Sequence, residues 1–303
     1  MLIDAESTSE LAFNLPARPQ VNSLTKHLFT QNVKLPKLKI VFKAIFALFA
    51  VFYVLGAIVY SQRDIEPVAA FDQPNEPLKI AIFGASGTAG DGILKAAMAS
   101  DDIGSIHVVT RRETPRMTEG AKSGKVRIVK HMDYLDYSAI IDQFKDVDAV
   151  FWAIGISAIG TDEQTYGLIH TDFPSAFVSA WNRVSEVPNR SFHFISSSDI
   201  SEDSTTMWIR EKIRSEKTLF GLAEGSDLRV IAFRPDYIGP TEEEAHLGQK
   251  MLYWFFRPVG AAVKSKEIGE AMIAATLSSK QFENGAKLPT PEIVRYATAY
   301  QNR

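Results

Sequence analysis

Residues 79–90 constrain the fold more than any other segment of this 303-residue chain. They are K-I-A-I-F-G-A-S-G-T-A-G, an apolar β-branched run that leads directly into three glycines and then into a helix-like stretch. Gly84 allows a tight turn off the strand, Gly87 lets the backbone approach a pyrophosphate, and Gly90 lets the helix pack against the strand. The N–H groups at the start of such a helix attract phosphate. The segment therefore predicts a strand–turn–helix unit that binds a dinucleotide.

The rest of the sequence supplies the context that this motif needs. Short apolar runs, rich in β-branched and aromatic residues, alternate with helix-length segments, which is typical of an α/β protein with a doubly wound parallel sheet, the Rossmann fold. Because the glycines follow the first strand of this pattern, we favour a dinucleotide site over a purely structural turn. We predict strands at residues 79–83, 106–110, 126–129, 149–153, 192–195 and 229–233.

A long apolar segment precedes this domain. Residues 44–62 carry no charge, and a helix of about 20 residues is about 30 Å long, the thickness of the hydrocarbon core of a bilayer. We therefore expect a single-pass membrane protein that contacts the lipid bilayer through residues 40–62. A buried core helix is the alternative, although the segment is apolar on every face. The predicted organisation is a polar arm at 1–39, this transmembrane helix at 40–62, a linker at 63–77, and a Rossmann domain with a small C-terminal substrate lobe at 78–303.

Composition excludes several classes of function. The net charge of -3 gives no reason to expect nucleic acid as a partner. The absence of cysteine excludes disulfides and thiolate metal sites, and the six histidines lack metal-ligand spacing, so we expect no metal. We expect His170 and His193 to be packed or exposed rather than to be ligands. Four lysines shortly before the apolar run would place the domain on the membrane side opposite the N-terminus, away from NADPH in a bacterial inner membrane, so the sequence leaves both the sidedness and the compartment open.

Two arginines follow the second predicted strand. Arg111 lies 21 residues beyond Gly90, where an NAD site usually carries an acidic residue for the ribose 2′-hydroxyl. An arginine there accommodates a 2′-phosphate instead. Arg111 and Arg112 therefore favour NADP(H) over NAD(H), the alternative being that they are solvated surface residues.

These motifs resemble the atypical branch of the short-chain dehydrogenase/reductase superfamily, and most closely the Tat-interacting-protein-type oxidoreductases. The resemblance covers residues 78–295 and includes F-W-A-I-G at 151–155, H-F-I-S-S-S at 193–198 and F-R-P-D-Y-I-G-P at 233–240. It implies an NAD(P)-dependent oxidoreductase. The cofactor contacts that it implies are Gly84, Ser86, Gly87, Thr88, Gly90, Arg111, Arg112, Asp133, Ala153, Gly155, Lys212 and Pro235.

The sequence departs from the family pattern at the catalytic position. In this superfamily a tyrosine exchanges a proton with the substrate, and a lysine four residues later lowers the pKa of that tyrosine. Here the catalytic positions are Ser197, Ser198, Trp208 and Lys212, with Trp208 where the tyrosine would be. An indole donates one hydrogen bond but cannot relay a proton near neutral pH.

Two functions therefore stay open. One is a membrane-anchored NADP(H)-dependent oxidoreductase that lacks the usual tyrosine, acts on an unknown small-molecule substrate, and takes its proton from water, Tyr237 or a serine. The other is a non-catalytic dinucleotide-binding subunit, redox-sensing or structural, of a membrane complex. A further apolar stretch at 251–256, M-L-Y-W-F-F, belongs to the core, to a lid over a substrate pocket, or to a loop that dips into the membrane.

Overall fold

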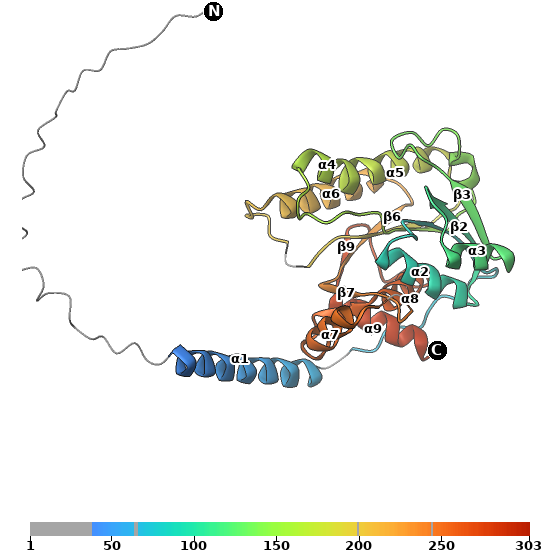
Figure 1. The fold of residues 1–303 in the computed structure, drawn as a ribbon. Coiled ribbons are helices and arrows are strands. Elements are labelled where there is room, and N and C mark those ends of the chain that lie inside the picture. Colours follow the sequence, from blue (N-terminus) through green and yellow to red (C-terminus); the bar gives the residue numbers. More distant parts are fainter. Residues whose placement is uncertain (1–37, 64–65, 199, 244) are drawn as a thin grey trace, which may run out of the picture. The chain divides into compact units, whose positions relative to one another are not determined.

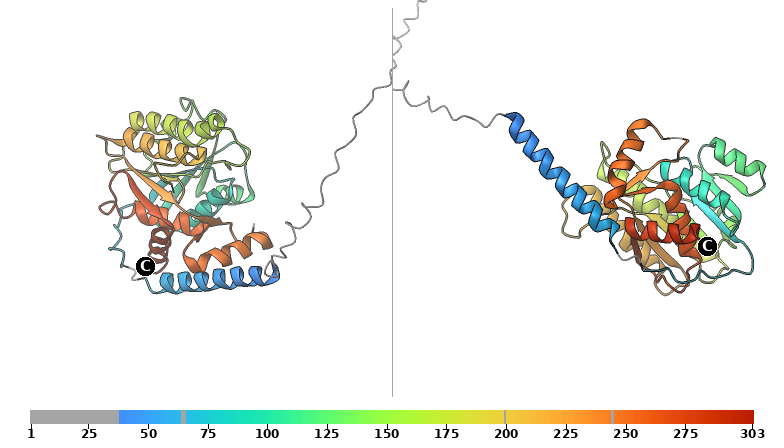
Figure 2. Two further views of the ribbon diagram at one scale, coloured as in Figure 1. Left: turned by 90° about the vertical axis from the view of Figure 1, so that its left-hand side faces the viewer. Right: turned by 90° about the horizontal axis from the view of Figure 1, so that it is seen from below.

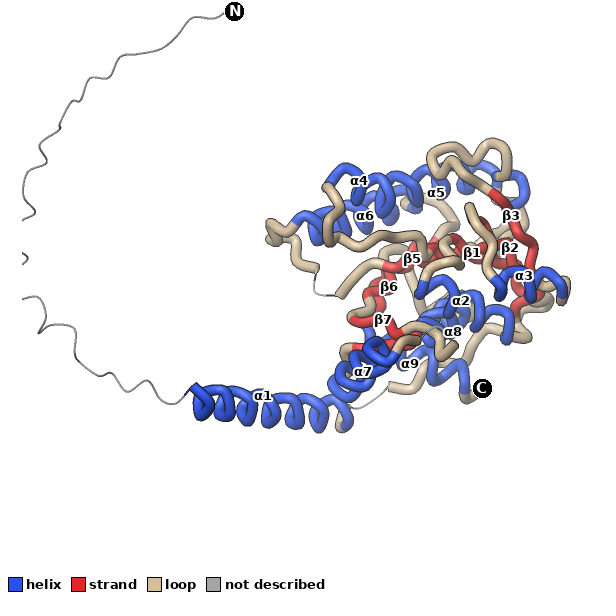
Figure 3. Tube along the Cα trace, in the orientation of Figure 1, coloured by secondary structure: helices blue, strands red, loops and turns tan. Residues whose placement is uncertain are grey.

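The computed structural model describes residues 38–63, 66–198, 200–243 and 245–303. Most of the predicted N-terminal arm at 1–39 lies outside these residues. The chain divides into two compact units, residues 1–51 and 52–303. Figures 1 and 3 show the helices and strands of the described residues.

Helix α1, Leu38–Ser61, forms over the uncharged segment and begins two residues before the predicted span. Its stretch Lys39–Ser61 has a mean hydropathy of 2.3, and none of its most apolar window is buried. By length and composition this helix could span a membrane. Because a core helix would be buried, the core alternative for this segment is wrong.

A seven-stranded parallel sheet forms the centre of unit 52–303, drawn in red in Figure 3. Its order is β3-β2-β1-β4-β5-β6-β9. All six predicted strands are present, and a seventh strand, β9, was missed because only one of its four residues is buried. The strands are β1 Leu78–Phe83, β2 Ile103–Thr110, β3 Val126–Lys130, β4 Ala149–Trp152, β5 Ser191–Ile195, β6 Arg229–Arg234 and β9 Ala286–Pro289.

Both faces of the sheet are covered by helices, which is why its strands are continuously apolar. Successive side chains of a strand point to opposite faces, so Ile80 and Ile82 enter one core, whereas Ala81 and Phe83 enter the other. Figure 1 and the left view of Figure 2 show the two layers on either side of the sheet. One layer contains α2 Thr88–Ala99, α3 Pro115–Lys122, α8 Ser265–Thr276 and α9 Thr290–Gln301; the other contains η2 Ile141–Phe144, α4 Glu163–Gly167, η3 Leu168–Asp172, α5 Phe173–Val184 and α6 Met207–Ala223.

A small lobe is inserted between β6 and α8. It consists of a two-stranded parallel sheet, β7 Tyr237–Gly239 and β8 Ala262–Lys264, with α7 Leu247–Phe256 and the short helix η4 Arg257–Val259. We did not predict these two strands, which contain only three residues each. Helix α7 contains no buried residue, so the interpretation of residues 251–256 as core is wrong.

Candidate functional site

The sheet changes winding direction between β1 and β4, which lie side by side at its centre. In open α/β sheets ligands bind outside the carboxyl ends of the strands at such a switch point. Here the backbone after β1 touches the backbone after β4. Gly84 has a φ of +82°, and a Cβ at this position would lie 2.6 Å from the carbonyl carbon of Ala153. Only glycine fits this turn.

The other two glycines of the motif, Gly90 and Gly87, differ in whether the fold has room for a larger side chain. A Cβ at Gly90 would lie 2.1 Å from the carbonyl oxygen of Gly84, so this position needs glycine for the helix to reach the turn. Gly87 is extended, with a φ of -100°, and a Cβ there would meet its nearest neighbour at an ordinary 3.5 Å. The fold therefore does not demand glycine at position 87. Because Gly87 caps α2 without a side-chain hydrogen bond, its small size leaves the start of the helix open to a ligand.

A cavity of about 630 Å³ lies at this switch point. It brings together seven of the predicted cofactor residues, although they are spread over 72 positions of the chain. These seven are Gly84, Ser86, Gly87, Arg111, Arg112, Ala153 and Gly155, and the other lining residues are Val109, Thr110, Tyr134, Ile154, Ile156, Leu168, Ile169 and Phe173.

The remaining predicted residues are not part of that lining. Thr88 lines a separate cavity of about 470 Å³, and a Cβ at Gly90 would meet the backbone of the turn. The carboxylate of Asp133 accepts a hydrogen bond from the Leu135 N–H at 2.9 Å, which holds a local turn. Its neighbour Tyr134, which the sequence analysis did not single out, lines the cavity instead.

Arg111 and Arg112 are exposed on the wall of the cavity. The guanidinium of Arg111 lies 5.9 Å from the ring centroid of Tyr134, within the range of a cation–π contact. The hydroxyl of Thr110 donates to the carbonyl of Arg112 at 2.6 Å and fixes the turn after β2. The two cations therefore give this end of the cavity a positive charge that suits a phosphate.

Lys212 is buried where β5 ends. Its ammonium donates to the carbonyl oxygen of Ile195 at 3.1 Å and lies 3.0 Å from Nδ1 of His170. Burial lowers the pKa of Lys212 from 10.5 to about 8. Burial, together with the nearby ammonium, lowers the pKa of His170 to about 3. At neutral pH a neutral imidazole therefore accepts from a charged lysine.

This contact of His170 was not predictable from the sequence, since 42 residues separate it from Lys212. The structure brings the two together through η3, a single π-helical turn packed on α6. Ser215 of α6 donates to the carbonyl of His170 at 2.6 Å. Nε2 on the other side of the ring lies 3.2 Å from both the N–H and the carbonyl oxygen of Ile156. Gly155 leaves room for the ring, since a Cβ there would lie 2.9 Å from it.

The depressed pKa of His170 predicts a specific loss of stability in acid. A folded pKa of about 3 below an ordinary 6.5 means that the unfolded chain binds the extra proton first. The stabilisation is complete above pH 6.5 and is lost as the pH falls toward 3. We expect His170→Asn, whose amide oxygen can accept the same bond, to reduce the loss of unfolding free energy between about pH 7 and 5 by about 1–2 kcal/mol.

Urea denaturation of the full-length protein in detergent micelles at the two pH values measures this difference. His107 and His193, whose pKa values are also lowered by burial, contribute equally to both proteins. An unchanged pH dependence in the variant would mean that folding does not lower the pKa of His170.

The three serines after β5 have different environments. Ser196 is buried and donates to Glu216 at 2.6 Å, and Glu216 also binds Arg234 of β6 through two hydrogen bonds. Ser197 and Ser198 are only half-buried, and the N–H of Ser198 donates to the carbonyl of Pro235 at 3.2 Å. This contact ties the segment after β5 to the Arg-Pro turn after β6.

Trp208 is half-buried in the first turn of α6. Lys212 follows it by four residues, so the two side chains lie on the same side of the helix. The structure thus places an indole one helical turn before the buried lysine. The described residues provide no tyrosine on the first turn of α6.

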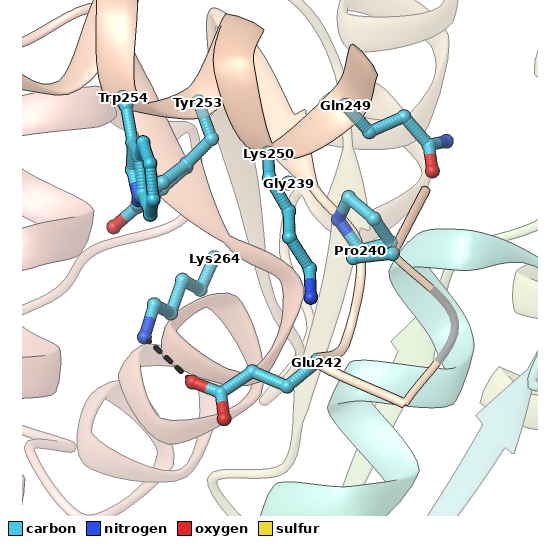
Figure 4. A pocket seen from close by; sticks show the side chains of 9 residues that line it. Gly239, Pro240, Glu242, Gln249, Lys250, Tyr253, Trp254 and Lys264 are labelled. Atoms are coloured by element: carbon cyan, nitrogen blue, oxygen red, sulfur yellow. Dashed lines mark hydrogen bonds and ion pairs between the residues drawn. The ribbon is translucent and has the colours of Figure 1, made fainter. Parts of the chain in front are cut away.

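A smaller cavity, of about 240 Å³, lies between α7 and the two-stranded sheet (Figure 4). Tyr253 and Trp254 of α7 line it together with Lys264, whose ammonium lies 3.3 Å from a carboxylate oxygen of Glu242. It shares Pro240, Ala245 and Gln249 with the cavity that reaches Thr88. The small lobe therefore borders the glycine turn, and α7 lies at its outer side.

The sequence matches no family model and no curated protein. Its structure is similar to that of a short-chain dehydrogenase/reductase from Serratia marcescens, with a TM-score of 0.56 and 14% identity, covering 72% of this chain and 97% of that chain. The protein BdcA, solved in complex with NADPH, gives 0.54 and 15%, covering 71% and 93%. The UDP-glucuronic acid 4-epimerase of Bacillus cereus, solved with NAD, gives 0.53 and 14%, covering 70% and 78%. This likeness establishes the fold, which is the Rossmann-type fold of short-chain dehydrogenases/reductases.

Proposed function

We propose that the chain is a membrane-anchored NADP(H)-dependent oxidoreductase of the atypical short-chain dehydrogenase/reductase type. The observation that carries this proposal is the cavity at the switch point, which gathers the glycine turn, both arginines and Gly155. Gly87 supports it independently, because the protein itself has no steric need for glycine there. Structural neighbours solved with NADPH and with NAD agree with a nicotinamide dinucleotide as the ligand.

Each part of the cavity suits one part of that cofactor. The open start of α2 would bind the pyrophosphate, and Arg111 with Arg112 would bind a 2′-phosphate. Lys212 lies outside the cavity lining, at the end of β5; by its resemblance to the family lysine, it would hold the nicotinamide ribose. The bound cofactor supplies a hydride, and the protein's own residues orient it and exclude water. The closer resemblance to the Tat-interacting-protein group remains part of this proposal.

The arginine pair predicts a preference for NADPH over NADH. A charge-assisted hydrogen bond to phosphate contributes about 1.5–3 kcal/mol, or roughly 10- to 150-fold in affinity. We expect the double variant Arg111→Ala and Arg112→Ala to lose most of this preference, while Arg183→Ala, which removes an exposed arginine from α5, keeps it. Calorimetric titration of the full-length protein with both cofactors tests the preference. Equal affinities of the unaltered protein for NADPH and NADH would contradict it.

The membrane anchor is a separate part of the proposal, and it rests on the length and exposure of α1. We expect the full-length protein to pellet with membranes and to resist extraction by alkaline carbonate, because a spanning helix is held by the hydrocarbon core. A chain that lacks residues 1–62 should be released into the supernatant by the same carbonate treatment. Release of the full-length protein by carbonate would show that α1 does not cross the bilayer.

The alternative function is a non-catalytic dinucleotide-binding subunit of a membrane complex. The indole at position 208 favours it, because that side chain cannot relay a proton. Both functions allow NADPH to bind, but only the oxidoreductase consumes it. Turnover of NADPH with a panel of carbonyl compounds and quinones therefore separates the two.

A further inference from the structure

Helix α7, which contains no buried residue, exposes an apolar face. Its exposed apolar residues are Leu247, Met251, Leu252, Trp254 and Phe255, with exposed fractions of 75%, 61%, 46%, 70% and 41%. Residues 249, 253 and 256, at helical spacing on the other side, are only partly exposed and face the lobe. A contiguous exposed apolar patch of this kind marks an interaction surface.

The chain itself limits how far the domain can be from α1. Val68 and Phe71 pack against the core of the domain, and the carboxylate of Asp72 accepts a 2.6 Å hydrogen bond from Ser279. Helix α1 ends at Ser61, so only residues 62–67 connect it to the packed domain. Six residues span at most about 20 Å when fully extended. A domain tied this closely to a spanning helix stays at the bilayer surface.

A direct contact joins α7 to the second half of α1 within unit 52–303. The hydroxyl of Tyr53 donates to the carbonyl of Phe255 at 2.7 Å, and the two rings stack with centroids 5.0 Å apart. Helix α7 therefore lies beside the end of α1 that is nearer the domain.

We propose that α7 lies in the interface of the bilayer that α1 crosses, with its apolar face among the lipid acyl chains. This proposal rests on the membrane anchor proposed above. A short amphipathic helix in this position buries its apolar face about 5–10 Å below the headgroups, and tryptophan is enriched at that depth. Trp254 also lines the cavity of the small lobe. In this arrangement its side chain separates that cavity from the lipid.

The absence of cysteine makes the proposal directly testable. Met251→Cys places a single thiol on the exposed apolar face, and Ser123→Cys places one at an exposed position after α3 as a matched control. Each full-length variant is labelled with an environment-sensitive fluorophore and reconstituted into phosphatidylcholine vesicles, with or without bromine on the acyl chains. We expect brominated lipid to quench most of the emission from position 251 and none from position 123.

Two results would overturn the proposal. Quenching of position 251 by aqueous iodide would place α7 in water, and a blue-shifted emission that brominated lipid leaves unchanged would mean that protein, such as a second copy of the chain, covers the face. Flotation of the vesicles reports the anchor separately. Protein that floats but shows no lipid quenching would contradict the placement of α7 alone, whereas protein that fails to float would remove the anchor as well.

Discussion

Gly87→Ala is expected to weaken NADPH binding by roughly 10- to 150-fold, because the added methyl group displaces a phosphate from charge-assisted hydrogen bonds worth about 1.5–3 kcal/mol. Its effect on stability should be small. The new Cβ meets no atom closer than 3.5 Å, and alanine in place of glycine before a helix costs about 1 kcal/mol or less.

Gly90→Ala should give the opposite pattern. Its Cβ would lie 2.1 Å from a backbone oxygen, and crowding of this kind typically costs about 1–3 kcal/mol or more in unfolding free energy. Gly221→Ala, in α6, has open space around it and serves as the control for both.

Urea denaturation and calorimetric titration of the three full-length variants separate binding from folding. Normal NADPH affinity in Gly87→Ala would mean that no phosphate approaches this turn. A loss of stability in Gly87→Ala as large as in Gly90→Ala would mean that position 87 is a structural glycine after all.

Trp208→Tyr is expected to raise carbonyl reduction by at least about tenfold, because a general acid contributes about 10²–10⁴-fold and the new phenol would stand one turn before Lys212. The unaltered protein should have negligible activity on simple ketones and secondary alcohols. Lys212→Ala should weaken cofactor binding in both backgrounds, since the ammonium is the group expected to hold the nicotinamide ribose. Stopped-flow measurement of NADPH oxidation with a panel of carbonyl compounds and quinones tests these expectations.

Trp208→Phe is the matched control for that experiment, since it removes the indole N–H without supplying a phenol. It should stay as inactive on ketones as the unaltered protein. Rapid ketone reduction by the unaltered protein, undiminished in Trp208→Phe, would mean that another residue carries the proton and that Trp208 is not at the catalytic position.

The fold was predictable because its signals are local. Ile80 to Phe83 are apolar in sequence, and the structure buries them in two cores on opposite faces of the sheet, so a continuous apolar run was the right indicator of a parallel strand. The small lobe was not predictable, because β7 and β8 contain three residues each and their pairing depends on the domain that surrounds them. Helix α7 could be predicted as apolar, but its exposure follows only from the tertiary structure.

Some residues of the candidate site were likewise predictable from the sequence, and others were not. The glycine turn and Arg111 follow directly from the spacing along one strand and its neighbour. His170 does not, because its contact with Lys212 depends on how a π-helical turn packs on α6. A histidine without metal-ligand spacing gives no sign of such a contact in the sequence. Tyr134 was missed for a simpler reason, since Asp133 beside it matched the family pattern.

Titration of the full-length protein with NADPH in a calorimeter tests the central claim most directly. We expect one molecule bound per chain, with an affinity that falls in Gly87→Ala and is unchanged in Gly221→Ala. Binding of NADPH does not depend on whether Trp208 permits catalysis. A folded protein that binds neither NADPH nor NADH would contradict the assignment of the cavity at Gly84, Gly87 and Arg111 to a dinucleotide.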